Sequence, residues 1–223
     1  MKKKKILIMS DDLRMHSGIA TQSKELVLGT IHKYDWVQLG AAINHPENGK
    51  IVDMSDATTK ELGISDAYLK IYASTGYGNP DLLRELIQIE KPDAILHFTD
   101  PRFWIWLYQM EHEIRQNIPI FYLNIWDDLP DPLYNANYYR SCDLLMSISK
   151  QTYGINKIIL SKHGYEDWQT KYVPHGVNPK EHHIVDKNDT KFKEFEQKHG
   201  LDKYKFKDTI ENNDNLKISG SHF

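Results

Sequence analysis

Short apolar runs alternate with longer amphipathic segments along most of this chain. The apolar runs, rich in branched and aromatic residues, predict strands over residues 5–10, 36–39, 50–54, 69–73, 94–98, 120–125 and 144–148. Helical periodicity between them predicts helices over 21–31, 81–90 and 102–116. Strands that alternate with helices are typical of a parallel sheet, and strands without polar alternation predict a sheet covered on both faces. The expected fold class is α/β, a single Rossmann-like parallel-sheet domain with helices on both faces.

The composition changes near residue 187. Lysine, acidic residues and asparagine dominate residues 187–223, which contain few large apolar side chains. One amphipathic helix is predicted over 191–199, and the segment beyond Phe206 has too little apolar surface to fold alone. We therefore expect a Rossmann-like domain over residues 1–185 and a charged helical or disordered tail over 186–223.

Composition and charge narrow the classes of function. A chain with 40% hydrophobic and 26% charged residues is neither collagen-like, fully disordered nor a coiled coil. The formal net charge of −3 argues against a protein that binds nucleic acid through its phosphates. A single cysteine, Cys142, excludes an intramolecular disulfide and favours a reducing, cytoplasmic location. The lysines at 2–5 precede only a short apolar run, so neither a leader peptide nor an integral membrane segment is expected.

The carboxyl ends of the strands are where ligand contacts are expected, because ligands of doubly wound sheets bind there. In the loop after the first strand, Ser17-Gly18 directly precedes a helix, where backbone N–H groups and the helix dipole favour an anion. A plain turn that needs glycine is the alternative, and both interpretations are open. The loop lacks the glycines of a dinucleotide fingerprint, and the chain has no Gly-Lys-Ser/Thr phosphate loop.

Two further loops place carboxylates beside aromatic residues. The loop after the fifth predicted strand contains Asp100 and Arg102, and the loop after the sixth contains Trp126, Asp127 and Asp128. Carboxylates accept hydrogen bonds from sugar hydroxyls, and aromatic faces stack on C–H-rich surfaces, so these loops suit a hydroxyl-rich ring. The alternative is that Asp100 and Asp127 cap the helices that follow them.

Metal and nucleophile chemistry finds little support in the sequence. Asp127-Asp128 could contact Mg²⁺, but no third ligand stands at a useful spacing, and the histidines lack ligand spacing. Ser149 lacks the Gly-x-Ser-x-Gly pattern of a nucleophilic elbow. We therefore expect no metal and no cofactor.

Five segments carry a family resemblance. They are residues 5–18, which end in Ser17-Gly18, then KPDAILH at 91–97, IPIFYLNIWD at 118–127, CDLLMSISK at 142–150 and YVPHGVN at 172–178. In this order they resemble the amino-terminal, acceptor-side domain of GT-B glycosyltransferases, in particular the retaining family-four or "glycosyltransferases group 1" type. The resemblance covers about residues 5–180 and implies one half of a GT-B fold.

The resemblance also implies roles for residues. Ser17 and Gly18 would form the loop that reaches the donor diphosphate, and Asp127 would be the catalytic residue. The residues expected to bind the acceptor are Asp100, Arg102, Trp126 and Asp128. Trp126 stands where the family usually has histidine, so an acceptor contact made by that histidine is not carried over.

The activity implied is transfer of a sugar from a nucleotide-sugar donor to a saccharide or other hydroxyl acceptor, with retention and without a metal. The family's donor-binding carboxyl-terminal domain has a Glu-x₇-Glu motif, and no pair of glutamates here has that spacing. We therefore expect an acceptor-side half that is inactive alone. The alternatives are a non-catalytic truncated remnant, an acceptor-binding module completed by a separate donor-domain chain, and an unrelated Rossmann-like nucleotide binder.

Overall fold

The computed structural model describes residues 2–179, 186 and 188–200. The chain divides into two compact units, residues 1–176 and 177–223, and each is described by itself. The boundary expected at residue 185 and the tail expected beyond Phe206 fall outside the described residues.

The strands of the first unit are β1 (Lys4–Asp11), β2 (Tyr34–Ala42), β3 (Ile51–Asp53), β4 (Leu69–Thr75), β5 (Ala94–Phe98), β6 (Ile120–Asn124), β7 (Leu144–Ser147) and β8 (Thr170–Tyr172). Its α-helices are α1 (Gly18–Thr30), α2 (Ser55–Leu62), α3 (Pro80–Glu90), α4 (Ile105–Gln109), α5 (Glu111–Ile114), α6 (Ala136–Arg140) and α7 (Lys150–Ser161). Short 3₁₀ turns are η1 (Pro101–Trp104), η2 (Leu133–Asn135) and η3 (Asp167–Gln169).

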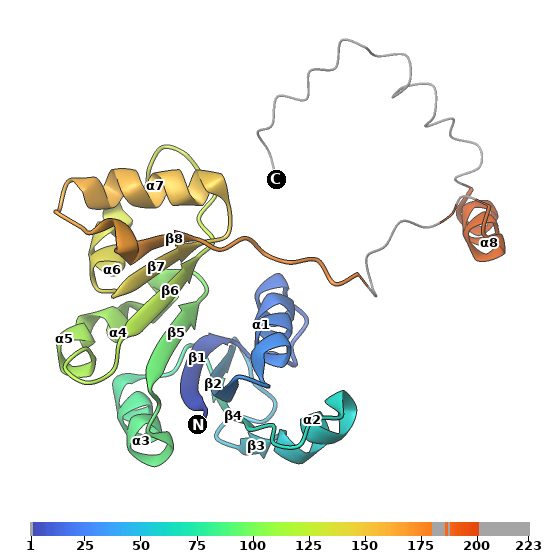
Figure 1. Cartoon of the computed structure of the whole chain (residues 1–223), viewed down its shortest axis with the longest axis horizontal. Coiled ribbons are helices and arrows are strands. Elements are labelled where there is room, and N and C mark those ends of the chain that lie inside the picture. Colours follow the sequence, from blue (N-terminus) through green and yellow to red (C-terminus); the bar gives the residue numbers. More distant parts are fainter. Residues whose placement is uncertain (1, 180–185, 187, 201–223) are drawn as a thin grey trace, which may run out of the picture. The chain divides into compact units, whose positions relative to one another are not determined.

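The strands form one sheet in the order β3-β4-β2-β1-β5-β6-β7-β8 (Figure 1). All neighbouring strands are parallel except β3 and β4. The chain moves outward from β1 to β4, returns through α3 to β5, and then moves outward in the other direction. The strand order therefore reverses between β1 and β5, where Ser10 pairs with Phe98. The predicted α/β, Rossmann-like fold is confirmed.

Helices cover both faces of the sheet (Figure 1). On one face, α3 to α7 pack on buried strand residues such as Leu7 and Ile95. On the other face, α1 and the segment before β4 pack on Ile8, Trp36 and Ile71. Successive strand side chains point to opposite faces, so Leu7 and Ile8 belong to different cores. This is why the strands show apolar runs rather than alternation.

The continuous helix predicted over 102–116 is wrong. The chain instead forms η1, α4 and α5, with the break between the two α-helices at Met110. Met110 has φ −102° and ψ 15°, outside α-helical values, so the α-helix cannot continue through it. The Met110 side chain is buried together with those of Trp104, Leu107 and Tyr108.

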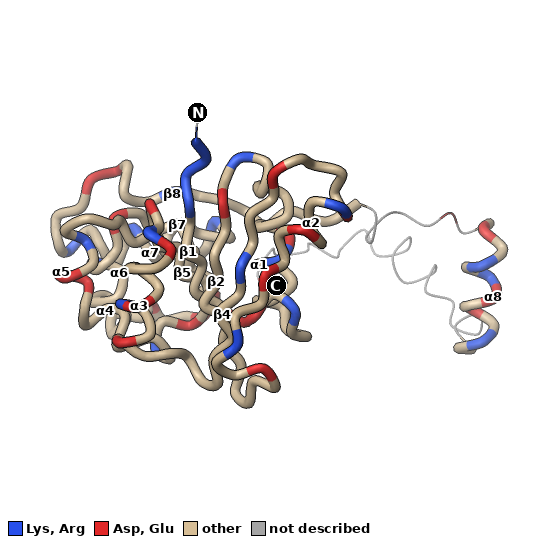
Figure 2. The backbone as a smooth tube through the Cα atoms, turned by 90° about the horizontal axis from the view of Figure 1, so that it is seen from below, with Lys and Arg blue, Asp and Glu red and all other residues tan. Residues whose placement is uncertain are grey.

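The second unit is described through its helix α8 (Thr190–His199). The Asp189 carboxylate accepts a hydrogen bond from the Lys191 N–H at 2.7 Å, and Gly200 ends the helix in the left-handed conformation. Charged residues of both signs follow one another along it (Figure 2). The helix predicted over 191–199 is confirmed.

Helix α3 ends in a buried carboxylate. Glu90 accepts hydrogen bonds from Lys5 Nζ (2.8 Å) and from the hydroxyls of Tyr68 (2.8 Å) and Tyr72 (2.7 Å). Burial alone would raise the pKa of Glu90, but these donors outweigh it and hold the pKa below its ordinary value. The carboxylate therefore joins the end of α3 to the amino ends of β1 and β4.

Glu90→Gln should lower the free energy of unfolding by about 1.5–3 kcal/mol at neutral pH, because hydrogen bonds to a charged group are lost. Because the pKa of Glu90 is lower in the folded than in the unfolded protein, its carboxylate stabilises the fold at pH values above the unfolded-state pKa. This contribution is lost as the pH falls through the folded-state pKa. The difference between variant and wild type should therefore shrink in acid. Urea unfolding at neutral and acidic pH measures this, with exposed Glu85→Gln on the same helix as the control. A loss that is equal at both pH values would contradict the assignment.

Candidate functional site

A cleft of about 250 Å³ opens between the loops that follow β5 and β6. The loops lie together because β5 and β6 are neighbouring parallel strands, whose carboxyl ends share one edge of the sheet. The residues that line the cleft are Asp100, Pro101, Arg102, Tyr122, Ile125, Trp126, Asp127 and Asp128. They include the predicted catalytic residue and all the predicted acceptor residues. Ser17 and Gly18 are not among them.

One wall of the cleft is an ion pair. The Asp100 carboxylate accepts hydrogen bonds from the Arg102 backbone N–H (2.9 Å), from Arg102 Nε (3.0 Å) and from a terminal guanidinium nitrogen. Burial raises the pKa of Asp100, but the bonds from Arg102 prevail and the pKa lies below its ordinary value. Asp100 also caps η1, so the helix-cap interpretation of this residue is correct.

The indole of Trp126 also lines the cleft. The Arg102 guanidinium carbon lies 5.4 Å from the Trp126 ring centroid, in a cation–π arrangement. The indole N–H donates to the Asp128 carbonyl at 3.0 Å, and Tyr134 packs edge-on at 5.8 Å. Because its N–H is occupied within the loop, the indole offers a ligand its ring surface rather than a hydrogen bond.

Asp127 and Asp128 are exposed at the mouth of the cleft. Asp128 Oδ1 accepts a hydrogen bond from the Leu129 N–H at 2.8 Å. The Asp127 backbone carbonyl accepts one from Gln151 at 2.9 Å, whereas its carboxylate has no partner among the described residues. The described helices that follow are not capped by Asp127, so the helix-cap interpretation is wrong for this residue. Its backbone is held and its carboxylate is available to a ligand.

A buried amide network supports this loop and escaped the sequence analysis. Asn124 Oδ1 accepts from the Trp126 N–H (3.0 Å), and Asn124 Nδ2 donates to Asn156 Oδ1 (2.7 Å). Asn156 Nδ2 in turn donates to Ser147 Oγ (2.7 Å). The chain linked in this way runs from the cleft loop through β6 and α7 to β7. The available signal was an asparagine at the end of an otherwise apolar strand.

Ser17 and Gly18 lie at the start of α1, after β1. Ser17 Oγ donates to Asp11 Oδ2 at 2.6 Å and accepts from the Ala20 N–H at 3.0 Å, so Ser17 is the helix N-cap. Gly18 is exposed, its φ lies outside the left-handed region, and a Cβ there would meet nothing within 4 Å. The turn therefore does not require glycine. What the glycine provides is open space before the first N–H groups of α1.

Tyr77, in the loop after β4, packs against η1. Burial raises the pKa of Tyr77, and the carboxylates of Asp11 and Asp100 raise it further. Its backbone carbonyl accepts a hydrogen bond from the Trp106 indole N–H at 3.2 Å. The ring stacks on Phe103 with centroids 4.8 Å apart.

A second missed feature is the buried carboxylate of Asp12. Arg14 donates to it from the backbone N–H (2.9 Å) and from the guanidinium (3.0 and 2.7 Å). Because the Glu47 N–H donates to His45 Nδ1, the proton of His45 is on Nε2, which donates to Asp12 Oδ2 at 2.9 Å. Burial raises the pKa of Asp12, but these donors outweigh it and the pKa lies below its ordinary value.

Gly40 leaves the space that Asp12 needs. A Cβ at Gly40 would lie 2.9 Å from Asp12 Oδ2 and 3.0 Å from Ile71 Cγ2, closer than side chains pack. The glycine in β2 is thus required by a close approach and not by its backbone angles. The absence of a side chain at Gly40 lets the loop after β1 pack closely against β2.

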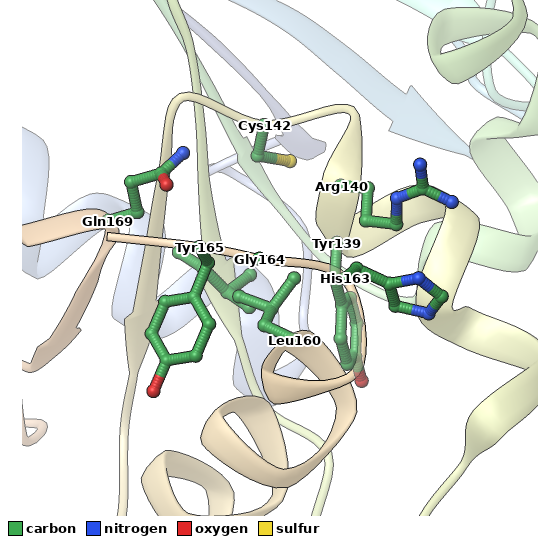
Figure 3. Close-up of a pocket in the computed structure, with 9 residues that line it drawn as sticks. Tyr139, Arg140, Cys142, Leu160, His163, Gly164, Tyr165 and Gln169 are labelled. Carbon is green, nitrogen blue, oxygen red and sulfur yellow. The ribbon is translucent and has the colours of Figure 1, made fainter. Parts of the chain in front are cut away.

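Cys142 lines a second cavity of about 110 Å³, beside the end of α7 (Figure 3). Its thiol is buried, and burial raises its pKa well above the ordinary value. A buried thiol with a raised pKa is a poor nucleophile. This cavity therefore offers no nucleophilic chemistry through Cys142.

The described part of the chain contains neither a metal-binding cluster nor a helix that could cross a membrane. No group of three or more His, Cys, Asp or Glu side chains in residues 2–179, 186 and 188–200 could hold a metal ion. Over the same residues, every helix is too short or too polar to cross a membrane.

No family model and no curated protein matches the sequence. Among solved structures, the chain is similar to a protein from Listeria monocytogenes provisionally identified as a UDP-N-acetylglucosamine 2-epimerase, at 16% identity and a TM-score of 0.45. The match covers 71% of this chain and 43% of that chain, so this chain spans less than half the length of that structure. A likeness this distant carries no conclusion about function.

Gly40→Ala should destabilise the protein by about 1–3 kcal/mol, because the added methyl group overpacks against Asp12 and Ile71. Gly154→Ala is the matched control, since Gly154 lies within α7 and a Cβ there meets nothing within 4 Å. That control should be neutral or stabilising by up to about 1 kcal/mol. Urea unfolding of the two variants measures the contrast, and equal stabilities would refute the packing argument.

Proposed function

We propose that this chain is the acceptor-side half of a retaining GT-B glycosyltransferase of the family-four or group 1 type. It would transfer a sugar from a nucleotide-sugar donor to a saccharide or other hydroxyl acceptor. The observation that supports this most is the cleft between the β5 and β6 loops, where an aromatic ring surface lies among carboxylates. That combination suits a hydroxyl-rich ring.

The acceptor would lie on the indole of Trp126, with its reacting hydroxyl toward Asp127. The Asp127 carboxylate has no partner among the described residues, so it can accept a hydrogen bond from that hydroxyl. In this place a carboxylate orients the hydroxyl and takes up its proton as the new bond forms. Asp128 and the Asp100–Arg102 pair would contact the remaining hydroxyls.

The donor diphosphate would bind at the start of α1. The first N–H groups of a helix have no partners within the helix, and the helix dipole favours an anion there. Gly18 adds no side chain that could obstruct the approach. These groups would stabilise the departing diphosphate, with no metal in the reaction. A donor-binding domain would supply the other nucleotide contacts, so this chain alone should give no measurable transfer.

A non-catalytic acceptor-binding module is the second candidate. Asp11 favours it, because its carboxylate lies 2.6 Å from Ser17 Oγ and opposes an anion at the start of α1. Residues 1–185 would then bind saccharide, and no diphosphate would bind at the start of α1. Turnover of a nucleotide sugar by this chain mixed with a donor-binding domain supports the transferase. Saccharide binding without turnover supports the module.

Asp127→Asn should weaken saccharide binding about tenfold or more, because a hydrogen bond to a charged group contributes about 1.5–3 kcal/mol. The unfolding midpoint should not change, since this carboxylate caps no described helix. Glycan-array screening followed by calorimetric titration measures binding, and thermal unfolding is recorded on the same samples. Asp35→Asn, at the amino end of β2, is the control. A lower midpoint with binding unchanged would assign Asp127 a structural role.

Gly18→Val should leave stability within about 0.5 kcal/mol of wild type, because the position is exposed and its φ is ordinary. It should abolish contact between a nucleoside diphosphate and the start of α1. Amide chemical shifts of residues 18 and 19 during titration with a nucleoside diphosphate measure this contact. Unshifted amides in the wild-type chain would refute the diphosphate loop.

A further inference from the structure

The charges that line the acceptor cleft are unbalanced. Three carboxylates and one guanidinium contribute side chains to the lining. The guanidinium of Arg102 is held by Asp100 through two of its nitrogens, so its charge is already neutralised. Asp127 and Asp128 have no cationic partner in the described parts of the chain. The cleft therefore presents an excess of negative charge to any ligand.

An anionic ligand would meet this excess at short range. Asp100 occupies Nε and Nη2 of Arg102, so an anion could reach the guanidinium only through Nη1, and there it would share the positive charge with the Asp100 carboxylate. Otherwise it would lie against Asp127 or Asp128. Either course costs free energy that an uncharged ligand does not lose.

The aromatic side chains of the cleft also favour a positive over a negative charge on the ligand. The surface of an indole ring attracts cations, and Arg102 already lies 5.4 Å from the Trp126 centroid. Tyr134, packed edge-on against Trp126, is 64% exposed beside it. Ring surfaces and unpaired carboxylates both favour an ammonium group and both disfavour an anion.

We propose that the cleft discriminates among saccharides by charge, binding amino sugars more tightly than neutral sugars and neutral sugars more tightly than uronic acids and sugar phosphates, with Asp127 as the main determinant. The proposal rests on the proposed acceptor function of the same cleft. One unit charge at about 6 Å, at an effective dielectric constant between about 40 and 80, changes affinity roughly three- to tenfold.

The experiment compares matched saccharides within several hexose series, each with a neutral, a 2-amino and a uronic acid member. The full chain is titrated at low salt by ligand-observed NMR. We expect affinity to fall in the order amino, neutral, acidic, with about three- to tenfold between successive members, and the differences to shrink at high salt.

Three variants assign the discrimination to Asp127. Asp127→Asn should reduce the ratio of affinities between successive members of a series several-fold. Asp127→Glu should retain the order of affinities because it retains the charge. Asp35→Asn removes the same charge from the opposite edge of the sheet and should leave the order unchanged.

Different results would overturn the charge discrimination and the saccharide-binding function of the cleft. If all members of a series bind equally, or the acidic member binds best, the charge proposal is overturned while the saccharide function stands. If none of the saccharides binds to the wild-type chain, both are overturned. An unchanged order in Asp127→Asn would overturn the assignment to that residue.

Discussion

The buried carboxylate of Asp12 determines how the carboxyl edge of this sheet is assembled. A carboxylate removed from water must be met by donors, and Arg14 and His45 supply them from two different loops. The loop after β1 and the loop after β2 are thereby fixed to each other. A few residues further on, Ser17 caps α1 and donates to Asp11, which joins the start of α1 to the end of β1.

Buried polar groups occur at both ends of the strands, and Gln38 within β2 is also buried and donates to Ser10 Oγ. Glu90 joins α3 to the amino ends, and the Asn124–Asn156 pair holds the β6 loop to α7 at the carboxyl ends. Each group has partners with good geometry, so the network stiffens the loops at little cost in stability. Of the carboxylates that line the cleft, that of Asp127 alone accepts no hydrogen bond from the described part of the chain.

The sequence was informative where local physics decides the structure. The strand at 94–98 and the caps of α3 follow from apolar runs and from Asn79-Pro80, and both agree with the structure. The helix over 102–116 could not be predicted correctly because its break at Met110 depends on burying side chains against a sheet that is assembled from distant residues. The cleft residues could be found because neighbouring parallel strands bring their loops together. Asp12 and His45 could not, because neither their separation along the chain nor their types indicates that they would meet.

The packing between Gly40 and Asp12 restricts which substitutions these two positions can accept during evolution. Any larger residue at position 40 must displace the carboxylate, and any change at position 12 leaves Arg14 and His45 without their acceptor. Neither position can change first without loss, so the two residues should be inherited together. Lineages that have lost the carboxylate should be those in which the glycine, too, has been replaced.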